Sequence, residues 1–178
     1  DKEYESLKNK KDITSLKHTY NEKIRDRGGL LKDEMHDEGD LMLLGSSELS
    51  SSVNQNPIRF FPFKGAEYDV SIYGRAYTQT LQHSTIISKT NNITDKDKIA
   101  IVVSAQWFER EEGIYGGDFS VNFSELQFYQ FFKNEKISKD NKIYYANRIS
   151  ELLKQSGEYG EERIYANLYY KDNFITNT

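Results

Sequence analysis

A glycine and two serines follow a short apolar run, and this spacing suits nucleophilic chemistry. The run is Leu41–Leu44, and Gly45, Ser46 and Ser47 come directly after it. A hydroxyl at a sharp turn beyond a buried strand can attack an acyl carbon. If a helix begins near Glu48, the unpaired backbone N–H groups of the turn form part of an oxyanion hole. Serine at such a turn also commonly caps a helix. The motif therefore leaves open whether Ser47 is a nucleophile or a cap.

Two later apolar runs end in groups that suit the same chemistry. One run ends at Tyr73 and is followed by Gly74, and the other ends near Val103 and is followed by Gln106. If both runs are strands of one parallel sheet, their carboxyl ends meet at the edge where Ser47 lies. A glycine N–H and a glutamine side-chain amide are suitable donors to an acyl oxyanion. For Gln106, a buried amide bonded to backbone is the alternative interpretation.

The three histidines, His18, His36 and His83, do not supply an obvious base for a serine. A nucleophilic serine is usually activated by a histidine that an aspartate orients. The pattern Asp33-Glu34-Met35-His36 has that form but lies before the strand. At ~3.3 Å per residue the strand separates His36 from Ser47 by more than about 15 Å. We therefore interpret His36 as part of a solvated, charged loop, and His83 as a structural histidine more readily than as a base.

Composition limits the class of protein. The chain has 178 residues, of which 37% are apolar, and a net charge of −4. A balanced charge argues against nucleic acid, which requires a concentrated basic face. The absence of cysteine excludes disulfides, thiolate metal sites and a cysteine nucleophile. We predict no metal site and no cofactor.

Hydrophobic patterning predicts an α/β organisation. Residues 1–38 are expected to form a weakly amphipathic surface helix, closed by Gly28 and Gly29, and a charged loop, and 39–178 an α/β domain. Strands are expected at Leu41–Leu44, Tyr68–Tyr73 and Ile99–Ser104. Helices are expected at Arg75–Ser88, Leu126–Lys133 and Tyr144–Gln155. This alternation predicts a parallel sheet flanked by helices.

Helix ends and aromatic residues add detail to the second half of the chain. Ser124-Glu125-Leu126-Gln127 has the form of a capping box, and Gly157 is expected to follow a helix as its C′ residue. Aromatic side chains gather in two segments, and most are expected in the core with some rings exposed. These rings belong to Phe60, Phe61, Phe63, Phe123, Phe128, Tyr129, Phe131 and Phe132.

Four ordered stretches, GSSEL, YGRAYTQTLQH, SAQWF and NFSELQFYQF, closely resemble the DltD family, which is a divergent relative of the SGNH hydrolases. The resemblance covers about Leu41 to Leu153. It implies a three-layer, flavodoxin-like SGNH fold that is incomplete in this chain. It also implies serine-dependent transfer of D-alanyl groups to lipoteichoic acid, a cell-wall modification of Gram-positive bacteria.

The resemblance assigns roles to individual residues. Ser47 would carry the D-alanyl group as an ester and pass it to a hydroxyl of the acceptor. Gly74 would stand at the second-block glycine, and Gln106 at a position where SGNH enzymes place the shorter asparagine. Arg75 could pair with a polyanionic acceptor, although an ordinary ion pair is the alternative. The residues expected to line the cleft are Ser46, Arg75, His83 and Trp107.

The chain departs from the family pattern in what it lacks. Members of the family carry an Asp-x-x-His motif far downstream of the serine, and no such motif follows Ser47 here. They also carry an N-terminal membrane helix, which is absent from this sequence. We therefore expect a soluble, nearly inactive part of a protein that is anchored at the outer face of the cell membrane. Its implied partners are lipoteichoic acid, a D-alanyl carrier protein and a membrane-bound O-acyltransferase. A noncatalytic scaffold that docks these partners is the alternative function.

Overall fold

The computed structural model describes residues 41–50, 54, 68, 70–89 and 94–175. The expected helix at 2–27, His18, Asp33, His36 and the aromatic residues Phe60, Phe61 and Phe63 lie outside these ranges. The described residues fall into two compact units. The first takes its described residues from Asp1–Thr78 and Thr90–Val103, and the second from Gln79–Lys89 and Ser104–Thr178.

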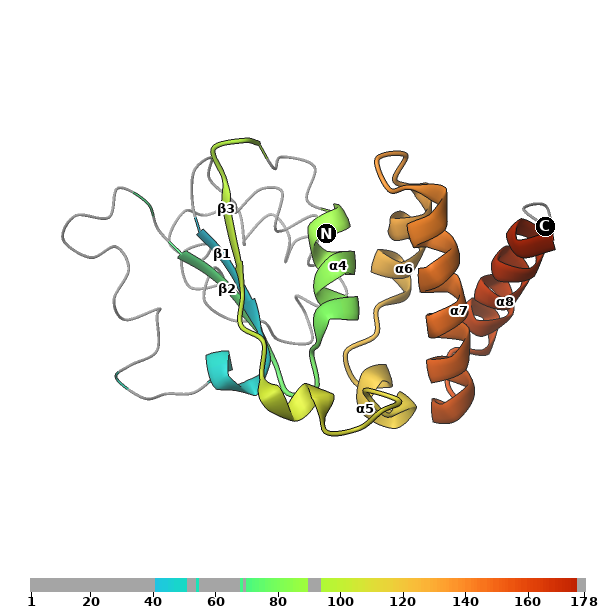
Figure 1. The fold of residues 1–178 in the computed structure, drawn as a ribbon, viewed down its shortest axis with the longest axis horizontal. Helices are drawn as coiled ribbons and strands as arrows, with labels where there is room; N and C mark the ends of the chain where they lie inside the picture. Colours follow the sequence, from blue (N-terminus) through green and yellow to red (C-terminus); the bar gives the residue numbers. More distant parts are fainter. Residues whose placement is uncertain (1–40, 51–53, 55–67, 69, 90–93, 176–178) are drawn as a thin grey trace, which may run out of the picture. The chain divides into compact units, whose positions relative to one another are not determined.

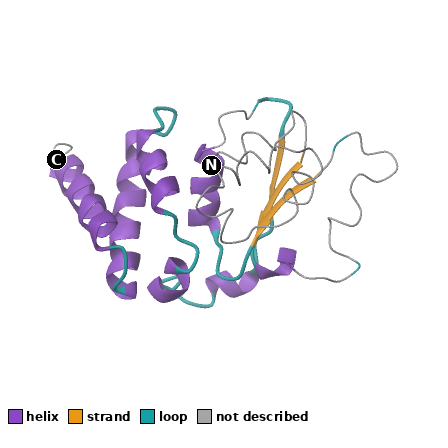
Figure 2. Ribbon diagram, turned by 180° about the vertical axis from the view of Figure 1, so that it is seen from behind, coloured by secondary structure: helices purple, strands orange, loops and turns teal. Residues whose placement is uncertain are grey.

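The first unit contains a parallel sheet of three strands in the order β2-β1-β3. These are β1 (Leu41–Gly45), β2 (Val70–Gly74) and β3 (Lys98–Ile101), and they lie side by side in Figure 2. Gly45 is the register partner of Gly74, and Leu44 is the register partner of Ile101. Because both pairings are parallel, the carboxyl ends of all three strands meet at one edge of the sheet. The predicted parallel sheet is confirmed.

The central strand β1 is the most apolar of the three because side chains on both of its faces are buried. Met42 and Leu44 are fully buried, as a continuous apolar run in a parallel sheet predicts. On the opposite face, Leu43 packs with Val70, Ile72 and Leu49. β3 is an exposed strand by comparison, because all four of its residues are exposed or half-buried.

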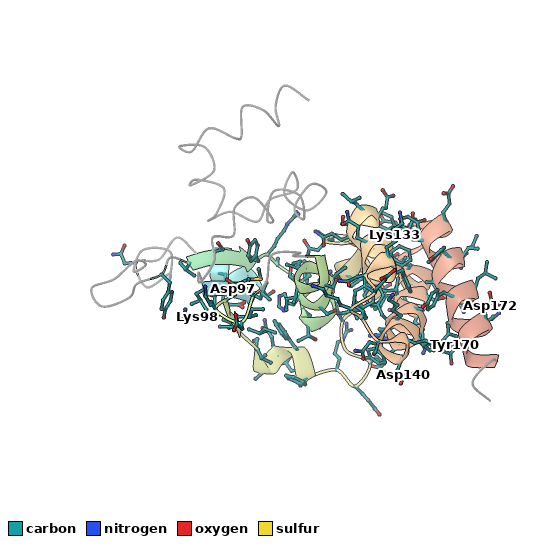
Figure 3. The ribbon with its side chains drawn as sticks, turned by 90° about the horizontal axis from the view of Figure 1, so that it is seen from above. Asp97, Lys98, Lys133, Asp140, Tyr170 and Asp172 are labelled. Carbon is teal, nitrogen blue, oxygen red and sulfur yellow. The ribbon has the colours of Figure 1, made fainter. Side chains whose placement is uncertain are left out.

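A tight turn sets the start of β3. Asp97 and Lys98 lie together at this point (Figure 3). The Asp97 carboxylate accepts hydrogen bonds from the Thr94 backbone N–H at 2.6 Å and from its hydroxyl at 3.2 Å. The Lys98 ammonium lies 4.5 Å from the centre of the Tyr68 ring, within reach of a cation–π interaction. The strand ends at Ile101, three residues earlier than predicted, and only the Val102 N–H continues the pairing, to the Leu44 carbonyl at 2.7 Å.

The second unit is helical (Figure 1). Its α-helices are α4 (Thr80–Lys89), α5 (Gly116–Ser120), α6 (Glu125–Lys133), α7 (Lys139–Ser156) and α8 (Gly160–Ile175), and a 3-10 helix, η3, spans Ala105–Phe108. The helix expected at 75–88 begins only at Thr80. The expected helix at 126–133 is confirmed, and the one at 144–155 lies within the longer α7.

Caps define the ends of α6 and α7. The Ser124 hydroxyl accepts the Gln127 N–H at 3.3 Å, and the Ser138 hydroxyl accepts the Asn141 N–H at 3.3 Å. Gly157 adopts φ of +75° and donates its N–H to the Leu153 carbonyl at 3.1 Å. The predicted cap at Ser124 and the predicted C′ glycine are both confirmed, because serine accepts at helix starts and glycine tolerates the left-handed conformation.

An aromatic core holds the second unit together. Phe128 is fully buried, and the rings of Phe131 and Tyr145 stack with their centroids 4.0 Å apart. Figure 3 places Lys133 at the end of α6 and Tyr170 on α8. The prediction that most of these rings are core is confirmed for the described residues. The buried aromatic residues from the predicted segments are Phe123, Phe128, Phe131 and Phe132, while Tyr129 is half-buried.

Strands and helices therefore alternate along the described chain up to β3, helices alone follow, and the strands form a parallel sheet, which makes this an α/β fold. Three parallel strands are consistent with part of an SGNH-like domain. Within the described ranges, no helix combines the length and apolarity that a bilayer crossing requires.

Candidate functional site

The turn after β1 presents the two serines differently. Ser46 is buried, with 3% of its surface exposed, while Ser47 opens the short 3-10 helix η1 (Ser47–Ser50) and is exposed to solvent. The turn is closed by the Leu49 N–H, which donates to the Ser46 carbonyl at 3.2 Å. Ser47 is therefore placed where a nucleophile must be accessible, and it is not packed in hydrocarbon. Its catalytic role stays a prediction.

Ser46 joins this turn to the loop that follows β2. Its hydroxyl donates to the Arg75 carbonyl at 3.1 Å, and its backbone N–H donates to Glu48 Oε1 at 2.6 Å. The side chain of Ser46 is therefore structural, because its hydroxyl is engaged and buried. Glu48 is exposed but holds the turn through the same residue. The sequence alone does not distinguish the two adjacent serines. Their positions relative to the end of β1 make one buried and the other exposed.

Gly74 lies at the same edge of the sheet as the serine turn. A Cβ added at Gly74 would lie 2.6 Å from Leu49 Cβ and 2.6 Å from the Ser46 carbonyl oxygen. Both contacts are too short to exist without displacing the turn, since one of them is to backbone. The bare backbone at Gly74 is therefore required for the serine turn to pack at this edge. Its role as an oxyanion donor stays a prediction.

Arg75 is half-buried in the first unit, and the remaining predicted site residues, His83, Gln106 and Trp107, belong to the second unit. His83 is fully buried, and its ring centroid lies 5.9 Å from that of Trp107, which is itself 8% exposed. This environment fits a structural histidine. Gln106 lies in η3 with an exposed side chain, which does not fit the alternative of a buried amide. That Gln106, His83 and Trp107 join Ser47 in one site stays a prediction.

The second unit also contains a groove that the sequence did not reveal. It has a volume of about 890 Å³, and its lining includes Leu81, Phe131, Tyr145 and Arg148 but none of the predicted site residues. Burial raises the pKa of the Tyr145 phenol, whose oxygen lies 3.4 Å from the Thr85 hydroxyl. A groove of this size, lined by apolar side chains and a few polar groups, is typical of ligand or peptide sites.

Arg148 shapes one wall of this groove. Its Nη2 donates to the Glu112 carbonyl, and its Nη1 lies 3.3 Å from Glu151 Oε2. Gly113, with φ of +73°, closes the adjoining loop through an N–H bond to the Arg110 carbonyl at 3.0 Å. The bond from Arg148 to Glu112 joins residues 36 positions apart, so no local motif could have predicted this part of the wall. Nowhere in the described part of the chain do three His, Cys, Asp or Glu side chains gather as a metal-binding group.

Comparison with known protein families shows which family the chain belongs to. A family model described as "DltD protein" matches residues 17–178. The chain belongs to the DltD family. The match spans every predicted site residue of this DltD chain, from Ser46 to Trp107, and confirms the resemblance seen in the sequence.

A curated relative gives the extent of the similarity. Protein DltD of Bacillus subtilis (strain 168) is 30% identical over 117 residues, which is 65% of this chain and 30% of that protein. The alignment with this DltD relative therefore covers less than a third of its length.

Proposed function

We propose that this chain is the part of a DltD protein in which Ser47 carries a D-alanyl group during D-alanylation of teichoic acid. The observation that supports this proposal best is the exposed Ser47 at the start of η1, directly after the central strand β1. Membership of the DltD family supplies the biological context. The acceptor is proposed to be lipoteichoic acid at the outer face of the cell membrane in Gram-positive bacteria.

The reaction divides into two acyl transfers. In the first, Ser47 Oγ attacks the carbonyl carbon of a D-alanyl thioester, the C–S bond breaks, and the serine proton leaves with the thiol. In the second, an acceptor hydroxyl attacks the ester, and its proton returns to Ser47 Oγ. Gly74 and Gln106 are the proposed donors to the oxyanion that forms in each step. The thioester donor is the D-alanyl carrier protein, which acts directly or with the help of the membrane-bound O-acyltransferase of the same pathway.

The proton transfers need a base. The DltD resemblance implies an Asp-x-x-His motif for this role, and this sequence has none after Ser47. Serine without a base is a poor nucleophile. We therefore expect acylation of Ser47 in this chain to be slow and to depend on added base.

Chemical rescue tests the proposal. The chain is incubated with the N-acetylcysteamine thioester of D-alanine, with and without imidazole, and acylation is followed by intact mass and located by fragmentation. We expect imidazole to accelerate modification at Ser47 and Ser47→Ala to abolish it. Ser84→Ala is the matched control, because Ser84 is an exposed serine of α4 and should have no effect. Equal modification of the Ser47→Ala variant, or none of the parent chain, would refute the proposal.

The groove of the second unit favours a second candidate function, a noncatalytic docking domain for the carrier protein or the acyltransferase. Leu81 lines this groove and is half-buried. In this case Leu81→Glu should weaken binding of the purified partner, while Ser47 stays unmodified by the thioester. Acylation at Ser47 with no partner binding would favour the enzyme.

A further inference from the structure

The loop after β2 holds a bulky residue in an unfavourable backbone conformation. Tyr77 has φ of +70°, in the left-handed region that residues with a large side chain rarely adopt. The turn is closed by the Thr78 N–H, which donates to the Arg75 carbonyl at 3.0 Å. Thr78 is only 1% exposed, so a buried residue anchors the turn. Strain of this kind persists where the surroundings enforce it, and it is concentrated at functional sites.

One carbonyl oxygen connects Tyr77 to the serine turn. The Arg75 oxygen that closes the Tyr77 turn also accepts the Ser46 hydroxyl at 3.1 Å. Tyr77 lies two residues beyond this acceptor, and Ser47 lies one residue beyond the donor. Both segments start from register partners, Gly74 and Gly45, at the carboxyl edge of the sheet. The turns that carry Tyr77 and Ser47 are therefore joined through one carbonyl oxygen in the first unit.

The Tyr77 side chain is available to a ligand. Half of its surface, 50%, is exposed, although its backbone is held firmly by the turn. An exposed aromatic ring attracts a cation placed over its face. Glu48, the acid next to Ser47, already accepts the Ser46 N–H through Oε1. The exposed ring of Tyr77 is therefore the group of this turn that can recognise a ligand.

The proposed donor carries a cation close to the reacting carbon. In an aminoacyl ester or thioester the α-ammonium nitrogen is two bonds from the carbonyl carbon, a separation of about 2.5 Å. Any group that reads this ammonium must lie within one side-chain length of the attacking Ser47. The shared Arg75 carbonyl joins the turn that carries Tyr77 to the turn that carries Ser47, which makes Tyr77 the candidate for such a group.

We propose that Tyr77 is a specificity-determining residue that binds the α-ammonium of an aminoacyl donor over its ring and so selects aminoacyl groups over plain acyl groups. This role rests on the proposed function of Ser47. The phenol oxygen is not required, because the ring face makes the interaction. The left-handed backbone at Tyr77 keeps the ring at this position on the edge of the sheet.

A pair of donors that differ at one substituent of the α-carbon tests the role. The N-acetylcysteamine thioesters of D-alanine and of propionate differ by the ammonium group, and each is normalised to its reaction with imidazole alone. We expect the parent chain to acylate Ser47 faster with D-alanine, and Tyr77→Phe to keep that preference. Tyr77→Leu should lower the preference by about two- to fivefold, the range of an exposed cation–π contact, with the propionyl rate unchanged.

A second variant separates the ring from the backbone strain. Asparagine tolerates the left-handed region, so Tyr77→Asn removes the ring and relaxes the turn. It should lose the preference as Tyr77→Leu does, while its thermal midpoint rises or stays the same. The role of Tyr77 would be overturned if Tyr77→Leu and Tyr77→Asn both kept the full preference for D-alanine. It would also be overturned if Glu48→Gln lost this preference while Tyr77→Leu kept it. Absence of acylation at Ser47 by either thioester would overturn the proposed function, and the role of Tyr77 with it.

Discussion

The edge of the sheet and the aromatic core of the helices solve different packing problems. At the sheet edge, Gly74 leaves no room for even one methyl group beside Leu49 and Ser46. In the helical unit, Phe128 is buried among five other rings with centroid separations from 5.0 to 6.3 Å. The first region is limited by backbone contacts and the second by side-chain volume. The two regions should therefore respond oppositely to changes in size.

The two regions also contribute differently, since the sheet edge determines the geometry of the candidate site and the aromatic core stabilises the fold. The serine turn depends on a few hydrogen bonds and on the absence of a side chain at Gly74. These features hold its atoms in position but bury little apolar surface. The rings around Phe128 bury much more surface, and burial supplies most of the free energy of folding. We expect substitutions in the core to affect unfolding, and those at the turn to affect acylation first.

The largest expected effect is the loss of volume in the aromatic core. Phe128→Ala should lower the free energy of unfolding by about 3–5 kcal/mol, because it removes a buried ring and leaves a cavity. Chemical denaturation monitored by circular dichroism measures this change. Phe108→Ala is the matched control, since Phe108 is 75% exposed, and it should change stability by less than about 0.5 kcal/mol. Similar losses for both variants would contradict the assignment of the core.

The opposite change, added volume, should be most damaging at Gly74. Gly74→Ala forces the backbone of Ser46 or Leu49 to move, which should cost about 1–3 kcal/mol. A displacement near 1 Å is enough to slow a positioned nucleophile by about a hundredfold. Ser47 acylation should therefore fall far more than stability. Gly160→Ala is the control, because its added Cβ meets nothing within 4 Å, and it should leave both measurements unchanged or stability slightly higher.

Sequence patterns predicted the elements that depend on short stretches of neighbouring residues. The apolar runs predicted the parallel sheet, and Ser124 and Gly157 marked helix ends that the structure confirms. The helix α8 (Gly160–Ile175) was missed because its apolar pattern does not follow one face. Ile164 and Leu168 on α8 are more than half exposed, while the small Ala166 is fully buried.

The details of the candidate site depend on contacts between distant residues. Nothing in the local sequence shows that the Ser46 hydroxyl reaches the Arg75 carbonyl, 29 residues away. The late start of α4 has a similar origin, because Tyr77 takes a left-handed conformation that its residue type does not indicate. Sequence reasoning therefore predicted Ser47 and Gly74 as site residues but not the hydrogen bonds that connect their turns.

Alkaline pH should destabilise the helical core through Tyr145. Burial raises the pKa of its phenol above the ordinary value near 10. The folded state keeps the proton when the unfolded state has lost it. Stability is therefore complete below about pH 10 and falls above it, by up to about 1.4 kcal/mol per pH unit for this group. Tyr145→Phe should reduce this slope in pH-dependent denaturation. Tyr144→Phe, at a position 68% exposed, should not, and an equal slope in both variants would refute the assignment.

The smallest expected change in stability follows from removing the tether between the serine turn and the Tyr77 loop. Ser46→Ala deletes the hydroxyl bond to the Arg75 carbonyl, but that oxygen keeps the Thr78 N–H. Because no buried acceptor is left without a partner, the loss should be about 0.5–1.5 kcal/mol, measured by denaturation. Acylation of Ser47 should nevertheless slow, and the preference for D-alanyl over propionyl thioester should decline, because Tyr77 loses its link to the turn. If Ser46→Ala changes neither the rate nor the preference, the sheet edge holds Ser47 through Gly74 and Glu48 alone, and the Ser46 hydroxyl acts only in packing.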